Sequence, residues 1–200
     1  MIVVSGFRRS GTSAMMRALG IGGLEIICTP KLENANVNDN GYFVSPSGLW
    51  ELGRPLYIRP DVMGPIAQDY PSHLVKVFYD GLPCLPVVNN HTWNVIFMQR
   101  DPDEIRASCE KAQASVKKAM EPAEPSSDRF DVYRDYNQND IDEVLNIVSE
   151  RSDMKVQRVE FADLIGDPVR VFNGLNLPID VKAAAGSIDP EFYRIRRQSW

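Results

Sequence analysis

Two arginines and three hydroxyl side chains crowd into the eight residues Gly6–Ser13, which read Gly-Phe-Arg-Arg-Ser-Gly-Thr-Ser. This stretch has the G-x-x-x-x-G frame of a phosphate-binding loop, and it follows a short apolar run that predicts a strand. Backbone N–H groups in such a loop, together with the N-terminus of the helix behind it, attract an anion. The residues that we expect to hold the anion are Arg8, Arg9, Ser10, Gly11, Thr12 and Ser13.

The lysine that follows the second glycine in nucleoside triphosphatases is absent, and Thr12 stands in its place. That lysine contacts the β- and γ-phosphates, while a neighbouring hydroxyl holds Mg²⁺. The positive charges of this loop come earlier instead, from Arg8 and Arg9. The exchange disfavours a kinase and favours another anionic ligand.

A second arginine stands where another strand is expected to end. The apolar run Asn94–Gln99 leads into Arg100-Asp101-Pro102, and Ser108 follows eight residues after the arginine. Asp101 and Pro102 are typical of a helix N-cap and first helical position, so Arg100 also lies at a strand-to-helix junction.

Four apolar runs alternate with helical patterns, which predicts a parallel sheet with helices on both faces. The fold class is therefore α/β, a three-layer fold like that of P-loop nucleoside triphosphatases, with its ligand beyond the carboxyl ends of the strands. The expected strands are Met1–Ser5, Leu74–Tyr79, Asn94–Gln99 and Met154–Val159. The expected helices are Thr12–Leu19, one from Pro102 to about Ala119, one capped by Asp140, and two short helices after the last strand, the second starting at Asp167-Pro168.

The composition fits one soluble domain spanning residues 1–200, with 44% hydrophobic residues and a formal net charge of −5. An acidic chain is a poor binder of nucleic-acid polymers, and no apolar run is long enough to cross a membrane. The N-terminal run does not have the pattern of a secretory signal, so a cytoplasmic location is expected. Three scattered cysteines and two histidines show no metal-ligand spacing.

These motifs resemble those of the sulfotransferases. Val4–Ser13 resembles the loop that binds the 5′-phosphosulfate, and Arg100 with Ser108 resembles the signature that binds the 3′-phosphate. Met154–Pro168 is similar to a less specific later segment of the family. The resemblance implies 3′-phosphoadenosine-5′-phosphosulfate as donor, no metal, and transfer of a sulfuryl group to a hydroxyl or amine.

Lys76 lies inside the apolar run Leu74–Tyr79, where an ammonium needs water or a partner. Cytosolic sulfotransferases have a lysine on a comparable strand and a histidine base two residues later, where this chain has Phe78. The resemblance therefore implies Arg9 and Lys76 as catalytic residues that stabilise charge on the reacting groups.

The general base stays open among four residues. Other branches of the family use a carboxylate shortly after a Gly-Tyr-Phe-like segment, but here Val44 follows Gly41–Phe43. Glu51 is favoured because its apolar neighbours would desolvate it and raise its pKa. The alternatives are Asp39, Asp80 and His73.

Residues 28–72 and 120–139 are expected to form the acceptor pocket or a lid, because the rest of the short chain is needed for the sheet and its helices. Arg194, Arg196 and Arg197 either close over the 3′-phosphate or form a solvated basic end. The acceptor and the oligomeric state cannot be deduced. A small-molecule kinase of the P-loop class and a catalytically silent nucleotide-binding module stay open as other functions.

Overall fold

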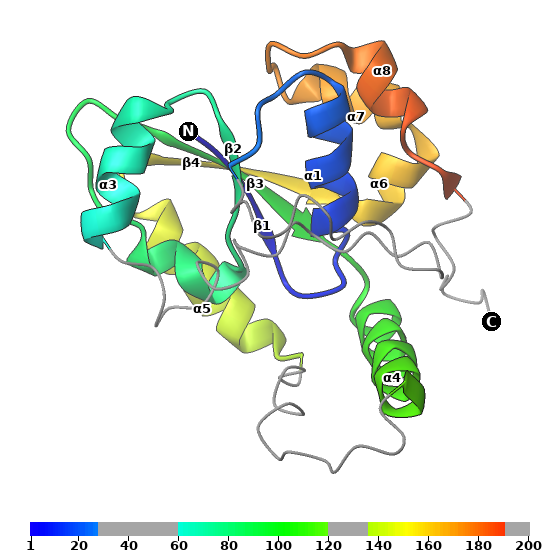
Figure 1. Cartoon of the computed structure of the whole chain (residues 1–200). Coiled ribbons are helices and arrows are strands. Elements are labelled where there is room, and N and C mark those ends of the chain that lie inside the picture. The colour runs from blue at the N-terminus through cyan, green and yellow to red at the C-terminus, as the bar shows by residue number, and fades with distance from the viewer. Residues whose placement is uncertain (28–59, 120–135, 191–200) are drawn as a thin grey trace.

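The structure is a computed structural model and describes residues 1–27, 60–119 and 136–190. Its centre is a sheet of four parallel strands in the order β2-β1-β3-β4 (Figure 1). The sheet confirms the predicted parallel α/β architecture. The strands are β1 (Ile2–Gly6), β2 (Leu74–Lys76), β3 (Trp93–Gln99) and β4 (Met154–Glu160).

Helices cover both faces of this sheet, which makes the predicted three layers (Figure 1). One face carries α3, the 3₁₀ helix η2 and α5, and the other carries α1, α6, α7 and α8. The remaining helix, α4, extends from the carboxyl end of β3. The helices are α1 (Thr12–Ile21), α3 (Pro60–Asp69), η2 (Tyr79–Cys84), α4 (Pro102–Ala119), α5 (Gln138–Ser149), α6 (Phe161–Gly166), α7 (Pro168–Gly174) and α8 (Val181–Gly186).

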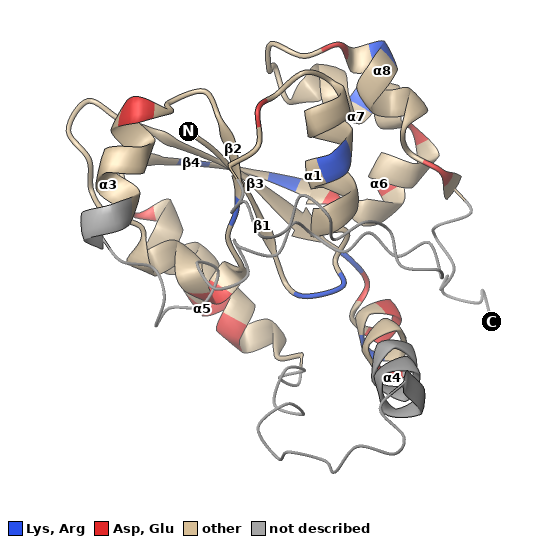
Figure 2. Ribbon diagram, viewed as in Figure 1, with Lys and Arg blue, Asp and Glu red and all other residues tan. Residues whose placement is uncertain are grey.

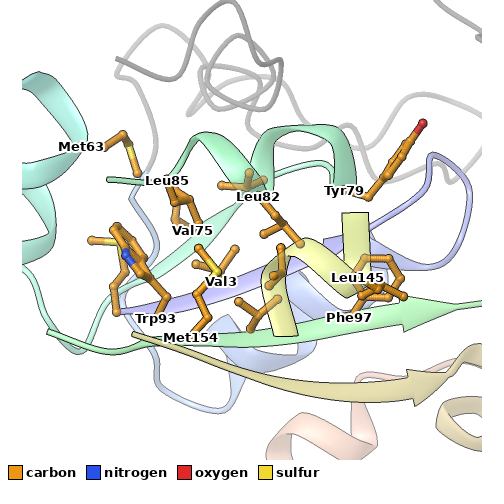
Figure 3. Packing of buried hydrophobic residues seen from close by; sticks show 14 of the residues in the cluster. Val3, Met63, Val75, Tyr79, Leu82, Leu85, Trp93, Phe97, Leu145 and Met154 are labelled. Carbon is orange, nitrogen blue, oxygen red and sulfur yellow. The ribbon is translucent and has the colours of Figure 1, made fainter. Parts of the chain in front are cut away.

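Alternation along the strands divides the core into two clusters. Val3 and Phe97 point toward the layer of α3 and α5, whereas Val4 and Ile96 point toward α1 and α6. Figure 3 shows the first cluster, in which Trp93, the first residue of β3, is fully buried. Each such apolar side chain stabilises the fold by about 1.5–3 kcal/mol when fully buried, so these clusters fix the strand ends in place.

The strand register places three loops along one edge of the sheet. Gly6 of β1 pairs with Met98 of β3, and Gln99 of β3 pairs with Glu160 of β4. The chain leaves β1 toward β2 on one side and reaches β3 on the other side. Such a switch point opens a crevice at the carboxyl ends of the strands, where α/β proteins bind ligands.

The second strand is shorter than predicted, because it ends at Lys76 rather than at Tyr79. Val77 and Phe78 are buried, but the chain then turns into η2, which begins at Tyr79. The apolar run therefore reflects burial under the helices as well as strand pairing, and these two causes give the same sequence pattern.

Two helix predictions also need correction. The cap of α5 is Asn137 and not Asp140, because the side-chain oxygen of Asn137 accepts a hydrogen bond from the Asn139 N–H at 3.0 Å. Three short helices follow β4 instead of two. The predicted cap of α7 is confirmed, since Asp167 accepts from the Arg170 N–H at 3.0 Å.

Candidate functional site

The loop after β1 is held in the shape that an anion-binding loop requires. Gly6, Arg9 and Gly11 all have positive φ angles, of 143°, 69° and 99°. The Ser10 hydroxyl donates a hydrogen bond to the Phe7 carbonyl oxygen at 2.7 Å and closes the turn. Gly11 caps α1, so the free N–H groups of the first helical turn face the edge of the sheet.

Gly11 also allows a close approach that no other residue permits. A methyl group at Gly11 would lie 2.3 Å from a ring carbon of Phe161, the first residue of α6. The predicted second glycine of the loop frame is therefore required both by its backbone angle and by the packing of α6 against the loop.

Replacing Gly11 with alanine is expected to lower the free energy of unfolding by about 2–5 kcal/mol, from backbone strain and overpacking. Gly23 offers a matched control, because its φ is also positive, at 105°, but nothing lies within 4 Å of an added methyl group. Gly23→Ala should lose only about 1–2 kcal/mol. Urea denaturation of both variants measures the difference, and equal losses would refute the close contact with Phe161.

The two cationic junctions predicted from the sequence meet in one site. The Arg9 Nε donates to the Ser108 Oγ of α4 at 2.9 Å, and the Arg100 Nη1 donates to the Arg9 carbonyl oxygen at 3.1 Å. Figure 2 shows basic segments at the β1–α1 loop, on β2 and before α4. The candidate 5′-phosphosulfate loop and the candidate 3′-phosphate residues are thus in direct contact.

Arg100 is largely buried and links the β1–α1 loop to α4. Its Nε forms an ion pair with Glu104 at 2.9 Å, and the two side chains are 9% and 4% exposed. The guanidinium also lies 4.8 Å from the centre of the Phe161 ring. Asp101 caps α4 as predicted, accepting from the N–H groups of Asp103 and Glu104 at 2.9 and 3.3 Å.

Lys76 is only 4% exposed and points to the phosphate loop. Its Nζ donates to the Ser13 Oγ of α1 at 3.1 Å and lies 5.1 Å from the centre of the Phe78 ring. Burial, reinforced by the positive charges of Arg8 and Arg9, lowers the pKa of Lys76 to about 7. The structure therefore brings a third cation to the loop, in a region of positive potential.

The four candidate bases lie in different parts of the chain. Glu51 and Asp39 lie outside the described residues, as do the tail arginines Arg194, Arg196 and Arg197. Asp80 lies in the first turn of η2, just past the end of β2 that carries Lys76.

His73 is wrongly placed to be the base. It precedes β2, at the opposite end of the strand from the loop, and its Nε2 contacts the Glu25 carboxylate at 2.7 Å.

A pocket opens at the same sheet edge, between the starts of α4 and α5, and its lining includes Tyr136 and Gln138 of the segment 120–139 as well as Glu160, which the sequence analysis did not name. Its volume is about 230 Å³, and its apolar wall contains Phe7, Phe97, Ile105 and Ile141. Its polar lining includes Ser10, Gln99, Arg100, Tyr136, Gln138 and Glu160. The signal for Glu160 was its position at the end of a predicted strand. We call this the α4–α5 pocket.

Within residues 1–27, 60–119 and 136–190, no group of three or more His, Cys, Asp or Glu side chains could hold a metal ion. No helix in those ranges is long and apolar enough to span a membrane. Cys84 and Cys109 are free thiols, and the third cysteine lies outside those ranges.

No protein-family model matches this chain, and no curated protein matches it. Among solved structures, the chain is similar to an unliganded crystal structure of a sugar kinase from Janibacter sp. HTCC2649. The alignment covers 95% of each chain at 12% sequence identity, with a TM-score of 0.39. At this TM-score the likeness is too weak to say anything about the fold or the chemistry of this chain.

Proposed function

We propose that this protein is a sulfotransferase that moves a sulfuryl group from 3′-phosphoadenosine-5′-phosphosulfate to a hydroxyl or amine. One observation carries the proposal: the buried Lys76 contacts Ser13 at the start of α1, while Arg9 of the same loop contacts Ser108. The contacts join the residues that resemble the family's 5′- and 3′-phosphate motifs.

The 5′-phosphosulfate would lie at the N-terminus of α1, against the N–H groups of Thr12 and Ser13. Burial is the main cause of the lowered pKa of Lys76, and the positive charges of Arg8 and Arg9 lower it further, which supports this assignment. A bound anion relieves that repulsion and makes the ammonium form of Lys76 more stable. The site is therefore electrostatically suited to an anion.

The 3′-phosphate would lie beside α4, at Ser108 and Arg100. A hydroxyl can accept one hydrogen bond while it donates another, so Ser108 can accept from Arg9 and donate to a phosphate oxygen. Arg100 already binds Glu104 and the Arg9 carbonyl, so it holds the loop in register with α4.

In the reaction, an oxygen or nitrogen of the acceptor attacks the sulfur, and the bond from sulfur to the bridging 5′-phosphate oxygen breaks. The acceptor proton passes to a base, and 3′,5′-adenosine diphosphate leaves. Lys76 would stabilise the negative charge that develops on the bridging oxygen, a contribution available only in the transition state. Asp80 is the one candidate base among the described residues that lies near this edge.

Phosphoryl transfer is the second candidate, because Lys76 supplies an ammonium group at the loop although Thr12 replaces the usual lysine. Parallel incubations with donor labelled on sulfur and with Mg²⁺·ATP labelled on the γ-phosphate distinguish the two. The proposal predicts release of 3′,5′-adenosine diphosphate and labelled product from a panel of alcohols, phenols and amines. Label transfer from ATP alone would instead establish a kinase, and no release from either donor would indicate a silent nucleotide-binding module.

A further inference from the structure

The α4–α5 pocket has the size and lining of a ligand site that adjoins the candidate donor site. Phe7, Phe97 and Ile105 are each at least 96% buried and make an apolar wall. The volume of about 230 Å³ corresponds to roughly eight water molecules at ~30 Å³ each. The pocket therefore suits a compound with one ring and a short chain, smaller than a nucleotide.

Among the charged groups that line this pocket, Glu160 is the acid that we expect to contact a ligand. Asp101 is used as the cap of α4, and Arg100 is balanced by its buried partner Glu104. Glu160, at the end of β4, forms no ion pair with any residue that the structure describes. Its carboxylate is the acceptor best placed for a cation in the pocket.

Two groups on different walls have raised pKa values, to which nearby carboxylates contribute negative potential after the larger effect of burial. The side chain of Glu160 is exposed overall, but its partial desolvation, followed by the nearby charge of Asp163, raises its pKa. Burial, followed by the charges of Asp142, Asp101 and Glu160, raises the pKa of Tyr136, and Arg106 opposes this only in part. A bound cation would relieve the potential at both walls.

The aromatic rings suit the apolar part of such a ligand and its charge. Phe7 and Tyr136 meet edge to face, with their ring centres 5.1 Å apart. The Tyr136 hydroxyl donates to the Gln138 side-chain oxygen, which fixes the ring at the mouth. Aromatic faces attract ammonium groups as well as apolar carbon.

We propose that the α4–α5 pocket binds a small apolar compound that carries a primary ammonium group, with Glu160 as the ion-pair partner of the ammonium. The claim concerns binding alone, so it holds whatever group the phosphate loop transfers. The pocket shares Ser10 and Arg100 with the candidate donor site, whereas Lys76 and Ser13 do not line it.

Calorimetric titration of the nucleotide-free full chain at pH 7 tests this claim with three matched probes: 2-phenylethylamine, 2-phenylethanol and 3-phenylpropionate. The amine should bind about ten- to a hundredfold more tightly than the alcohol, because a charge-assisted hydrogen bond is added, and the carboxylate should bind least. Glu160→Gln should abolish the preference for the amine, whereas Glu160→Asp should keep part of it. Glu150→Gln, at the far end of α5, removes the same charge and should change affinity less than about twofold.

Equal affinities for amine and alcohol would overturn the proposal, as would an amine affinity unchanged in Glu160→Gln. The melting temperature of each variant shows that it is folded, and the exposed side chain of Glu160 makes folding of both variants the expected result. Failure of this test leaves the donor site unaffected, because donor binding is measured with nucleotide alone.

Discussion

Replacing Lys76 with methionine is expected to stabilise the protein by about 2–4 kcal/mol at pH 7. The lowered pKa shows that keeping the buried lysine charged costs free energy of about this size, and methionine removes that cost. The side chain is 4% exposed and has a pKa of about 7, against 10.5 for an ordinary lysine. The same change should lower turnover about a hundred- to a thousandfold if Lys76 stabilises the leaving group. Urea denaturation and a donor-release assay measure the two effects.

The stability effect has a definite dependence on pH. The pKa of Lys76 is about 7 in the folded chain and near 10.5 in the unfolded chain, so unfolding takes up a proton between these values. Stability of the natural chain should therefore rise as the pH rises from about 7 toward 10.5. The gain from Lys76→Met should be full below pH 7 and shrink across that window.

Lys155→Met is the matched control, because Lys155 is an exposed lysine on β4, at the opposite edge of the same sheet. It should change stability by no more than about 0.5 kcal/mol at any pH. Two results would contradict the burial of a destabilised ammonium group at this site. One is a Lys76→Met protein that is less stable than the natural chain at pH 7, and the other is a gain in stability that does not depend on pH.

Replacing Arg9 with glycine is expected to weaken binding of 3′,5′-adenosine diphosphate about ten- to a hundredfold, because one charged hydrogen-bond donor is lost. Glycine is the suitable replacement, since Arg9 has a φ of 69° and alanine there would add backbone strain. The Arg9 carbonyl, which accepts from Arg100, is retained in this variant. Calorimetric titration measures the loss directly.

Lys182→Ala, on the exposed surface of α8, removes the same charge far from the loop and should leave nucleotide affinity within about twofold. Should Arg9→Gly bind the nucleotide as tightly as the natural chain, Arg9 would have no part in donor binding. Loss of affinity together with loss of the folded state would instead show that Arg9 is a structural residue, and the melting temperature separates these outcomes.

The positions of the candidate donor-binding residues could be predicted because they depend on local sequence. A glycine frame between a strand and a helix fixes where Arg9 and Thr12 must lie, and parallel strands bring Arg100 to the same edge. The contact of Arg9 with Ser108 and the burial of Lys76 are details that the structure adds.

The α4–α5 pocket was not predictable, because its walls come from segments that are distant in sequence. Tyr136 belongs to the 120–139 segment, for which only a general role was expected, and the packing of α5 against η2 and β4 brings Tyr136 and Glu160 near Phe7. The end of β2 was predicted wrongly for a related reason. Buried Val77 and Phe78 resemble strand residues although η2 begins directly after them. Burial alone does not reveal which element a residue belongs to.

The central claim is that the loop and α4 together bind a nucleotide with separate 5′- and 3′-phosphates, and one calorimetric comparison tests it. The natural chain is titrated at pH 7 with 3′,5′-adenosine diphosphate and with adenosine 5′-monophosphate, which lacks the 3′-phosphate. The site at Arg9, Arg100 and Ser108 predicts that the diphosphate binds at least tenfold more tightly. No binding of the diphosphate at millimolar concentration, or equal affinity for the two nucleotides, would contradict the claim.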